Sequence, residues 1–249
     1  MGLTDTLLLL GVVALATYAQ TVTGFAFGLI LMGGAVLLNL APVAMVAIMI
    51  SMLSLFNCAM ALYKNYGNID RQIVILCSIS GFVTLIFGVW VLNVLSEHHV
   101  HWLQIILGVA IILSSLMLIF RPKPRPNRAG KASFLFYGGL SGFMGGMFST
   151  SGPPLVFHFY RQPLSQAVIR DSLLLIFSIN SIQRIAVVGY QGAFTLPILI
   201  VTATAIPTVL VFTWLGRRFP PPVSDAAMRR SAFILLLLSG VSLCLSALL

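Results

Sequence analysis

The stretch that decides the fold is residues 139–154, which reads Gly139-Leu-Ser-Gly-Phe-Met-Gly-Gly-Met-Phe-Ser-Thr-Ser-Gly-Pro-Pro154. It interrupts an apolar region that runs from residue 132 to residue 160. Glycine adds backbone freedom and two consecutive prolines remove N–H donors, so we expect continuous helix to stop within residues 149–154. A second interruption, at residues 23–28, divides the apolar region 3–40, which is too long for one membrane crossing.

The composition places these interruptions in a membrane protein. Of 249 residues, 59% are apolar and 8% are charged, whereas soluble proteins carry about 25% charged residues. The mean hydropathy is +1.05. These values exclude a soluble enzyme, a nucleic-acid-binding domain and a disordered chain, and they predict a polytopic helical membrane protein.

Uninterrupted apolar segments supply the other crossings, since a span needs about 20 residues. Six segments qualify, namely 43–63, 72–95, 102–120, 165–189, 194–215 and 231–249. We therefore expect an all-α polytopic membrane protein with eight membrane helices in two inverted repeats of four. The first helix of each repeat, helix 1 or helix 5, is a broken helical hairpin. The N-terminal repeat covers residues 1–121, a basic cytoplasmic connector 122–131, and the C-terminal repeat 132–249.

The distribution of positive charge supports this topology. The chain has 14 Lys and Arg against five Asp and Glu, a formal net charge of +9. Thirteen of the cations fall in the windows 64–71, 121–131, 161–170 and 217–230. If each interrupted region enters and leaves on one side, all four windows share one face, which the positive-inside bias makes cytoplasmic. Both termini then lie on the outer face, and the basicity indicates orientation, with no nucleic acid as a partner.

A short internal repeat accompanies the two interruptions. Residues 23–28 align with residues 141–146 at an offset of 118. Each half then consists of a hairpin plus three spans, an odd number of crossings, so the second half is inverted relative to the first. Inverted repeats with broken helices are typical of secondary transporters, which bind substrate near the midplane. Chance similarity between glycine-rich helices is the alternative explanation.

Two facing helix breaks would make a pocket suited to an anion, because the N-terminal end of a helix offers free N–H groups and a positive dipole end. The expected substrate-binding residues are glycines that allow close backbone approach, hydroxyl donors, two mid-helix amides and one isolated cation: Gly24, Gly28, Gly142, Gly152, Thr23, Ser141, Ser149, Ser151, Asn57, Asn180 and Arg184. The alternatives are that the glycines only pack helices and that Arg184 extends to the interface. The two amides could instead brace the hairpins across the repeat interface or simply bond a neighbouring helix.

Other chemistries fit the sequence poorly. Ser149 stands where the Gly-x-Ser-Gly motif of rhomboid-type proteases needs glycine, and paired interior carboxylates are absent, so no enzyme activity is expected. Residues 97–101 contain three histidines and a glutamate, but we interpret them as a polar turn and expect no metal and no cofactor. His158 is either a proton relay or a helix-packing residue.

Two motifs resemble the paired signatures of the sulfite exporter TauE/SafE family, also called the toluene sulfonate uptake permease family. They are Gln20-Thr-Val-Thr-Gly-Phe-Ala-Phe-Gly28 and residues 139–154. Ala26 stands where glycine is more typical, and Met32-Gly33 where a proline often stands. The resemblance implies an inner-membrane secondary carrier with eight helices in two repeats. It also implies a cargo of small sulfur-containing anions such as sulfite, sulfonates or sulfoacetate, usually exported.

The resulting hypothesis is a secondary transporter of such anions that works by alternating access. Its partners are the small anionic substrate and the lipid bilayer, with protons as a candidate coupling ion; no oligomeric state is predicted. Two alternatives remain: a carrier for another small organic solute, such as an organic cation or amino acid, and a non-transporting membrane scaffold subunit.

Overall fold

The computed structural model describes residues 2–63, 68–119 and 125–219, together with positions 234, 237, 240, 241, 244 and 245. Within this part of the chain the regular structure is entirely helical. The expected last span, 231–249, lies largely outside the described residues, as do several cations of the expected basic windows.

The helices of the described part follow one another through short connections. They are α1 (Leu3–Thr23), α2 (Phe27–Leu37), α3 (Val43–Leu62), α4 (Arg71–His98), α5 (Val100–Ile119), α6 (Lys131–Phe148), α7 (Gly152–Phe159), α8 (Gln166–Tyr190) and α9 (Leu196–Arg218). Six of them, α1, α3, α4, α5, α8 and α9, are long and apolar enough to cross a membrane. Five of the six uninterrupted spans expected from the sequence are thereby confirmed, and the protein is a multi-pass membrane protein.

Local sequence explains where two of the long helices begin. The carboxylate of Asp70 accepts a hydrogen bond from the Ile73 N–H at the start of α4. The Ser165 hydroxyl oxygen accepts one from the Val168 N–H at the start of α8. Each side chain satisfies one of the N–H groups that the first helical turn leaves without a partner.

Both expected helix breaks are confirmed. The first separates α1 from α2 at residues 24–26, and the second separates α6 from α7 at residues 149–151. The residue that ends the helix before each break is left-handed, with φ 82° at Gly24 and 56° at Ser149. Ala26, in the first break, also has a left-handed φ of 88°, which costs an L-residue roughly 1–2 kcal/mol.

The two motifs that align in the sequence, however, do not coincide with the two breaks. The two breaks lie 125 residues apart, not 118. At the shorter offset, residues 23–28 align with residues 141–146, which lie inside α6. The glycines of α6 that produced the match serve helix packing, so their pattern does not mark a break.

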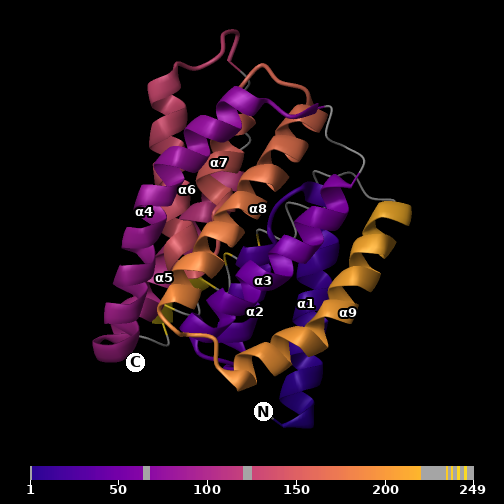
Figure 1. The fold of residues 1–249 in the computed structure, drawn as a ribbon, viewed down its shortest axis with the longest axis vertical. Helices are drawn as coiled ribbons and strands as arrows, with labels where there is room; N and C mark the ends of the chain where they lie inside the picture. Colours follow the sequence, from indigo (N-terminus) through magenta and orange to yellow (C-terminus); the bar gives the residue numbers. More distant parts are fainter. Residues whose placement is uncertain are drawn as a thin grey trace.

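The helices pack in two groups, which Figure 1 shows on the left and on the right. The helices α4, α5, α6 and α7 form one group, and α1, α2, α3 and α9 form the other. The helix α8 lies between them and contacts both α3 and α4. Helices from the two expected halves are therefore interleaved, since α9 packs on α1 and α3 while α4 packs on α6.

The closest pairing is between α4 and α6, and glycine makes it possible. A Cβ on Gly142 would overlap the backbone of Gly81, and a Cβ on Gly146 would overlap the carbonyl oxygen of Leu85. Such backbone-to-backbone contact is typical of membrane helices, where van der Waals packing replaces the hydrophobic effect between helices.

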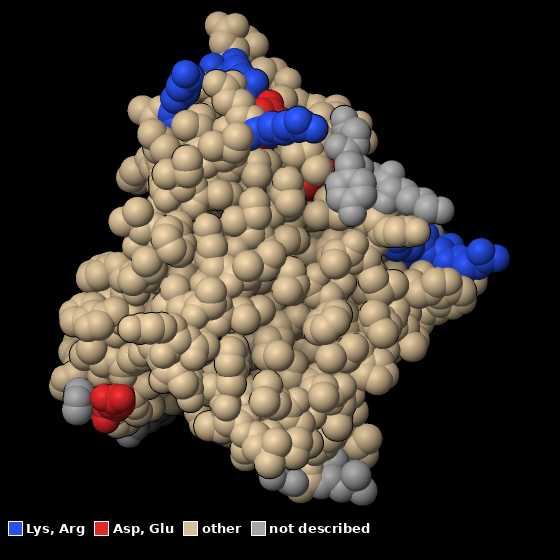
Figure 2. Space-filling model, in the orientation of Figure 1, with Lys and Arg blue, Asp and Glu red and all other residues tan. Residues whose placement is uncertain are grey.

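Charge is distributed unevenly along the helix axes. On the face that Figure 2 shows, Lys and Arg side chains gather at the upper end of the molecule and at the far end of α9. The lower end, where α1 begins, shows none on that face. The described ion pair between Arg128 and Asp70 (3.0 Å) connects the loop before α6 to the start of α4.

We predict that Gly142→Ala destabilises the fold, although alanine favours an isolated helix over glycine by about 1 kcal/mol. The atoms that a Cβ would meet are backbone atoms of Gly81 and cannot move aside. We expect the free energy of unfolding to fall by about 1–3 kcal/mol, the usual cost of overpacking. Thermal unfolding of the detergent-solubilised protein measures this.

The matched control is Gly11→Ala in α1, where an added Cβ meets nothing within 4 Å. Its unfolding midpoint is expected to stay unchanged or to rise slightly. Equal midpoints for the two variants would contradict the packing role of Gly142.

Candidate functional site

The first break is stabilised from within its own hairpin. Gly24 donates its N–H to the carbonyl oxygen of Gln20 (2.7 Å) and so ends α1. The Gln20 side chain then crosses the break, because its Oε1 accepts the N–H of Phe27 (3.2 Å), the first residue of α2. The same amide donates from Nε2 to the Cys58 sulfur on α3 (3.2 Å).

The second break is held from two sides. On one side, the Ser141 hydroxyl of α6 donates to the carbonyl oxygen of Ser151 (2.6 Å). On the other side, the Ser149 hydroxyl donates to the carbonyl oxygen of Ala47 on α3 (2.6 Å) and lies 2.8 Å from the Ser51 Oγ. Pro153 in the first turn of α7 fits a position whose N–H has no helical partner.

The two breaks lie against each other. A Cβ on Gly28, near the start of α2, would come within 2.6 Å of the Ser149 carbonyl oxygen and 3.3 Å of the Thr150 Cα. A Cβ on Gly152 would lie 3.9 Å from the Phe25 Cβ. Glycine is therefore required at position 28 for the two hairpins to meet.

Arg184 brings a positive charge to this meeting point. It lies on α8 and is 2% exposed. Its Nε donates to the Gly146 carbonyl oxygen (3.1 Å), and its Nη1 donates to the Ser51 Oγ (3.4 Å). In the part of the chain that the structure describes, ion pairs join Arg128 to Asp70 and Arg170 to Asp171, and no acidic side chain pairs with Arg184.

A cavity of about 30 Å³ opens between the breaks and α8. This is room for about two or three ordered waters. The lining residues are Gln20, Ala26, Gly28, Leu29, Ser51, Gly145, Ser149, Thr150, Ser151, Gly152, Phe177, Asn180, Ser181 and Arg184. We call this cavity the central pocket.

Asn180 is among the residues that line the central pocket. Its Oδ1 lies toward α4, where a Cβ on Gly81 would come within 3.6 Å, and it has no hydrogen-bond partner among the described residues. The Asn180 amide therefore keeps hydrogen-bonding capacity next to the pocket.

Six of the residues expected from the sequence line the central pocket: Gly28, Ser149, Ser151, Gly152, Asn180 and Arg184. Four others lie outside it, and each of them contacts backbone or side chains of other segments. Ser141 supports the second break from behind, Gly142 packs on α4, and Gly24 lies under Arg170, whose Cγ would be 2.7 Å from an added Cβ. The side chain of Thr23 lies outside the described residues.

Asn57, the fourth residue outside the pocket, connects its own helix α3 to α1 and to α9. It is fully buried, and its Nδ2 donates to the Thr21 Oγ1 of α1 (3.0 Å) and to the Thr213 Oγ1 of α9 (2.8 Å). Each threonine hydroxyl in turn donates to a carbonyl oxygen of its own helix. Of the alternatives considered for Asn57, this arrangement matches bonding between neighbouring helices.

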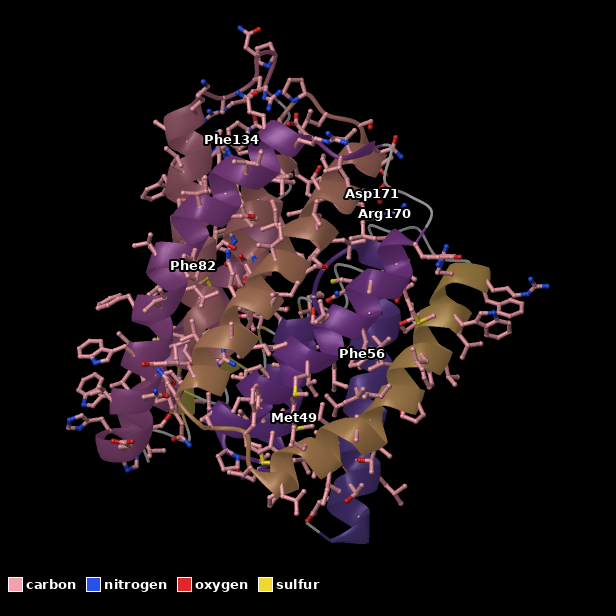
Figure 3. The ribbon with its side chains drawn as sticks, in the orientation of Figure 1. Met49, Phe56, Phe82, Phe134, Arg170 and Asp171 are labelled. Carbon is pink, nitrogen blue, oxygen red and sulfur yellow. The ribbon has the colours of Figure 1, made fainter. Side chains whose placement is uncertain are left out.

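A polar cluster lies near the start of α8, where Figure 3 labels Arg170 and Asp171. The fully buried Asp171 carboxylate accepts hydrogen bonds from Arg170 Nε (3.0 Å) and Asn68 Nδ2 (3.4 Å). The Ser172 hydroxyl accepts the Asp70 N–H (3.1 Å). Because Arg170 also covers Gly24, this cluster connects the first break to the loop before α4.

His158 belongs to a packing cluster and is not among the residues that line the central pocket. Its ring stacks on Tyr137 with centroids 4.3 Å apart and meets the edge of Phe134 at 4.8 Å. Its surroundings match the helix-packing alternative. In the described part of the chain no group of three potential metal ligands occurs.

Sequence reasoning missed Ser51 and Ser181. The second was detectable, because Phe177, Asn180, Ser181 and Arg184 are spaced i, i+3, i+4, i+7 and so share one helix face. A single serine such as Ser51, in an apolar span, carries no comparable pattern.

The fold and this site define a multi-pass helical membrane protein with a small polar pocket and a buried cation at the meeting point of two broken helices. The family model "Sulfite exporter TauE/SafE" matches residues 8–243. The chain therefore belongs to the TauE/SafE sulfite exporter family, whose members are transporters and not enzymes.

The similarity to a curated protein supports this assignment. The chain is 42% identical over 242 residues to the "Probable sulfite/organosulfonate exporter TauE" of Cupriavidus necator. The match covers 96% of this chain and 94% of that protein. No solved structure matches the chain.

We predict that Asn57→Ala lowers the free energy of unfolding by about 1–2 kcal/mol, because two buried hydrogen bonds are lost. A double-mutant cycle with Thr213→Val should give a coupling energy of about 0.6 kcal/mol, the average for such bonds in membrane proteins. Thermal unfolding in detergent measures both. The control is Thr204→Ala, whose exposed hydroxyl bonds only the Val201 carbonyl of its own helix; an equal loss in that variant would contradict the bracing role.

Proposed function

We propose that this chain is a secondary transporter that exports small sulfur-containing anions, such as sulfite or sulfonates, across the inner membrane. One observation carries the proposal: Arg184 is buried in the central pocket without an acidic partner among the described residues. The name of the Cupriavidus necator relative, a probable sulfite/organosulfonate exporter, supports the choice of sulfur anions and of export.

A buried guanidinium needs a counter-charge. An unpaired charge in a low-dielectric interior costs several kcal/mol, and an anion in the pocket offsets that cost. Arg184 has five N–H donors, of which the Gly146 carbonyl and Ser51 occupy two. The remaining donors fit the oxygens of a sulfite or sulfonate group, and the same positive charge disfavours an organic cation as cargo.

The proposed binding set has two parts. Gly28, Ser149, Ser151, Gly152, Asn180 and Arg184 face the cargo. Gly24, Asn57, Ser141 and Gly142 act indirectly, by shaping the hairpins and the helices that hold them. The hydroxyl of Thr23 remains a proposed donor to the cargo. This division is supported by the contacts of Asn57, Ser141 and Gly142 with protein groups.

We further propose that transport occurs by alternating access between inverted repeats, residues 1–121 and 132–249 on either side of the basic connector. Helix positions support the repeat, because α2 begins 125 residues before α7, α3 123 before α8, and α4 125 before α9. Arg184 supports the mechanism, because it bonds Ser51 of the first repeat and the Gly146 carbonyl of the second. A movement of one repeat against the other would change these bonds and the access to the pocket.

The basic end of the molecule is proposed to be cytoplasmic, with both termini outside. The concentration of Lys and Arg at one end of the visible face supports this orientation.

The transport proposal is tested by Arg184→Gln. In proteoliposomes with labelled sulfite, we expect the rate to fall at least about tenfold, since truncating one member of a buried charge pair costs 2–5 kcal/mol. Arg184→Lys, which keeps the charge but loses the planar fork, should be intermediate. The control is Arg218→Gln, at the exposed end of α9. Wild-type flux in Arg184→Gln would overturn the site.

The orientation is tested by cysteines introduced one at a time at two exposed positions, Asn127 in the loop before α6 and Tyr190 at the end of α8. Figure 1 shows these two segments at opposite ends of the molecule. An impermeant thiol reagent should label Asn127→Cys only from the cytoplasmic side and Tyr190→Cys only from the outside. The background is Cys244→Ser, because Cys58 and Cys77 are buried whereas Cys244 is partly exposed. Reversed labelling would refute the orientation, and labelling of both from one side would refute the topology.

A further inference from the structure

We propose that the central pocket selects cargo with a single negative charge, so that sulfite is carried as hydrogensulfite, HSO₃⁻, and not as the dianion. The inference rests on the proposed function and specifies which ionic form that same site accepts. It follows from a charge count at the pocket.

The count of formal charges gives +1. Among the described residues that line the central pocket, Arg184 alone has a charged side chain. The carboxylates of Asp171, on α8, and Asp70, just before α4, do not offset this charge. Asp171 forms an ion pair with Arg170, and Asp70 forms one with Arg128. One negative charge on the cargo therefore neutralises the site, and a second would remain buried without a partner.

The helix dipoles add little to this count. At each break the negative C-terminal end of one helix adjoins the positive N-terminal end of the next, α1 beside α2 and α6 beside α7. The free N–H groups are also few. Gln20 accepts the N–H of Phe27, and Pro153 and Pro154 in the first turn of α7 have none. The breaks therefore supply no second positive charge.

The neutral groups of the pocket suit a protonated oxyanion. The side chains of Thr150, Ser151 and Ser181 line it, and a hydroxyl accepts a hydrogen bond as readily as it donates one. A hydroxyl can therefore accept the O–H of hydrogensulfite while Arg184 and the Asn180 amide nitrogen donate to its other oxygens. With the proton on the cargo, each turnover moves one proton together with sulfite, and no titrating side chain is needed in the pocket.

The experiment compares three anions on the purified, full-length protein in detergent, by calorimetric titration on the acid and the alkaline side of neutral pH. Methanesulfonate carries one charge at both pH values, sulfate carries two, and sulfite changes from one to two. We expect methanesulfonate to bind equally at both pH values. Sulfite should weaken about tenfold per pH unit above the pKa of hydrogensulfite, in proportion to its singly charged fraction. Sulfate should bind at least about a hundredfold more weakly than methanesulfonate.

A variant that neutralises the formal charge of the pocket tests the count directly. Asn180→Asp is nearly isosteric and lies one helical turn from Arg184 on the same face of α8, so it reduces the formal charge of the pocket to zero. We expect it to abolish methanesulfonate binding while the unfolding midpoint stays the same or rises, because the buried guanidinium gains a partner. Asn180→Leu is the control that removes the amide without adding charge, and it should retain weakened binding.

The outcomes separate this inference from the proposed function. Sulfate that binds as tightly as methanesulfonate, sulfite affinity that does not change with pH, or normal binding by Asn180→Asp would overturn the single-charge rule and leave the anion site standing. Absence of binding by all three anions, or binding unaffected by Arg184→Gln, would overturn both.

Discussion

A backbone group that faces hydrocarbon has no water to bond, so a break in a membrane helix persists only where the protein itself satisfies the freed groups. This chain has two such breaks, and the rest of the site depends on how they are paired. Gln20 reaches across the first break to the Phe27 N–H. Ser141 and Ser149 hold the second through the carbonyl oxygens of Ser151 and Ala47. The breaks are therefore supported by side chains of the protein and do not need cargo to form.

The breaks in turn position the cation. Because residue 28 is glycine, the start of α2 reaches the Ser149 carbonyl, and the two hairpins enclose one pocket. Arg184 lines this pocket and donates hydrogen bonds to Ser51, in the first half of the chain, and to the Gly146 carbonyl oxygen, in the second half. Thirteen of the 14 cations lie in the four basic windows of the sequence, and Arg184 alone lies in the pocket.

Several features were predictable because they depend on local sequence. Span positions follow from apolar length, and the breaks follow from clusters of glycine, serine and proline. The offset between the two breaks was not predictable from the motif alignment, because glycine-rich stretches that pack helices and those that end helices look alike in sequence. In α6, Gly142 and Gly146 bring the helix against α4, whereas Ser149 ends it. Ala26 differs from the glycine expected at this position of the motif. It nevertheless adopts the left-handed backbone conformation that glycine adopts readily.

The sequence by itself determined the class of protein, the spans, the two breaks and the isolated position of Arg184 among the cations. Only the tertiary structure decided which polar residues face the pocket. Asn57 and Asn180 occupy similar places in their helices, yet the first bonds Thr21 and Thr213 and the second lines the pocket. The physical reason is that helix formation depends on neighbours three or four residues away, whereas a polar side chain finds its partner on another helix. That partner is set by the packing of distant segments and by the face of the helix that it meets.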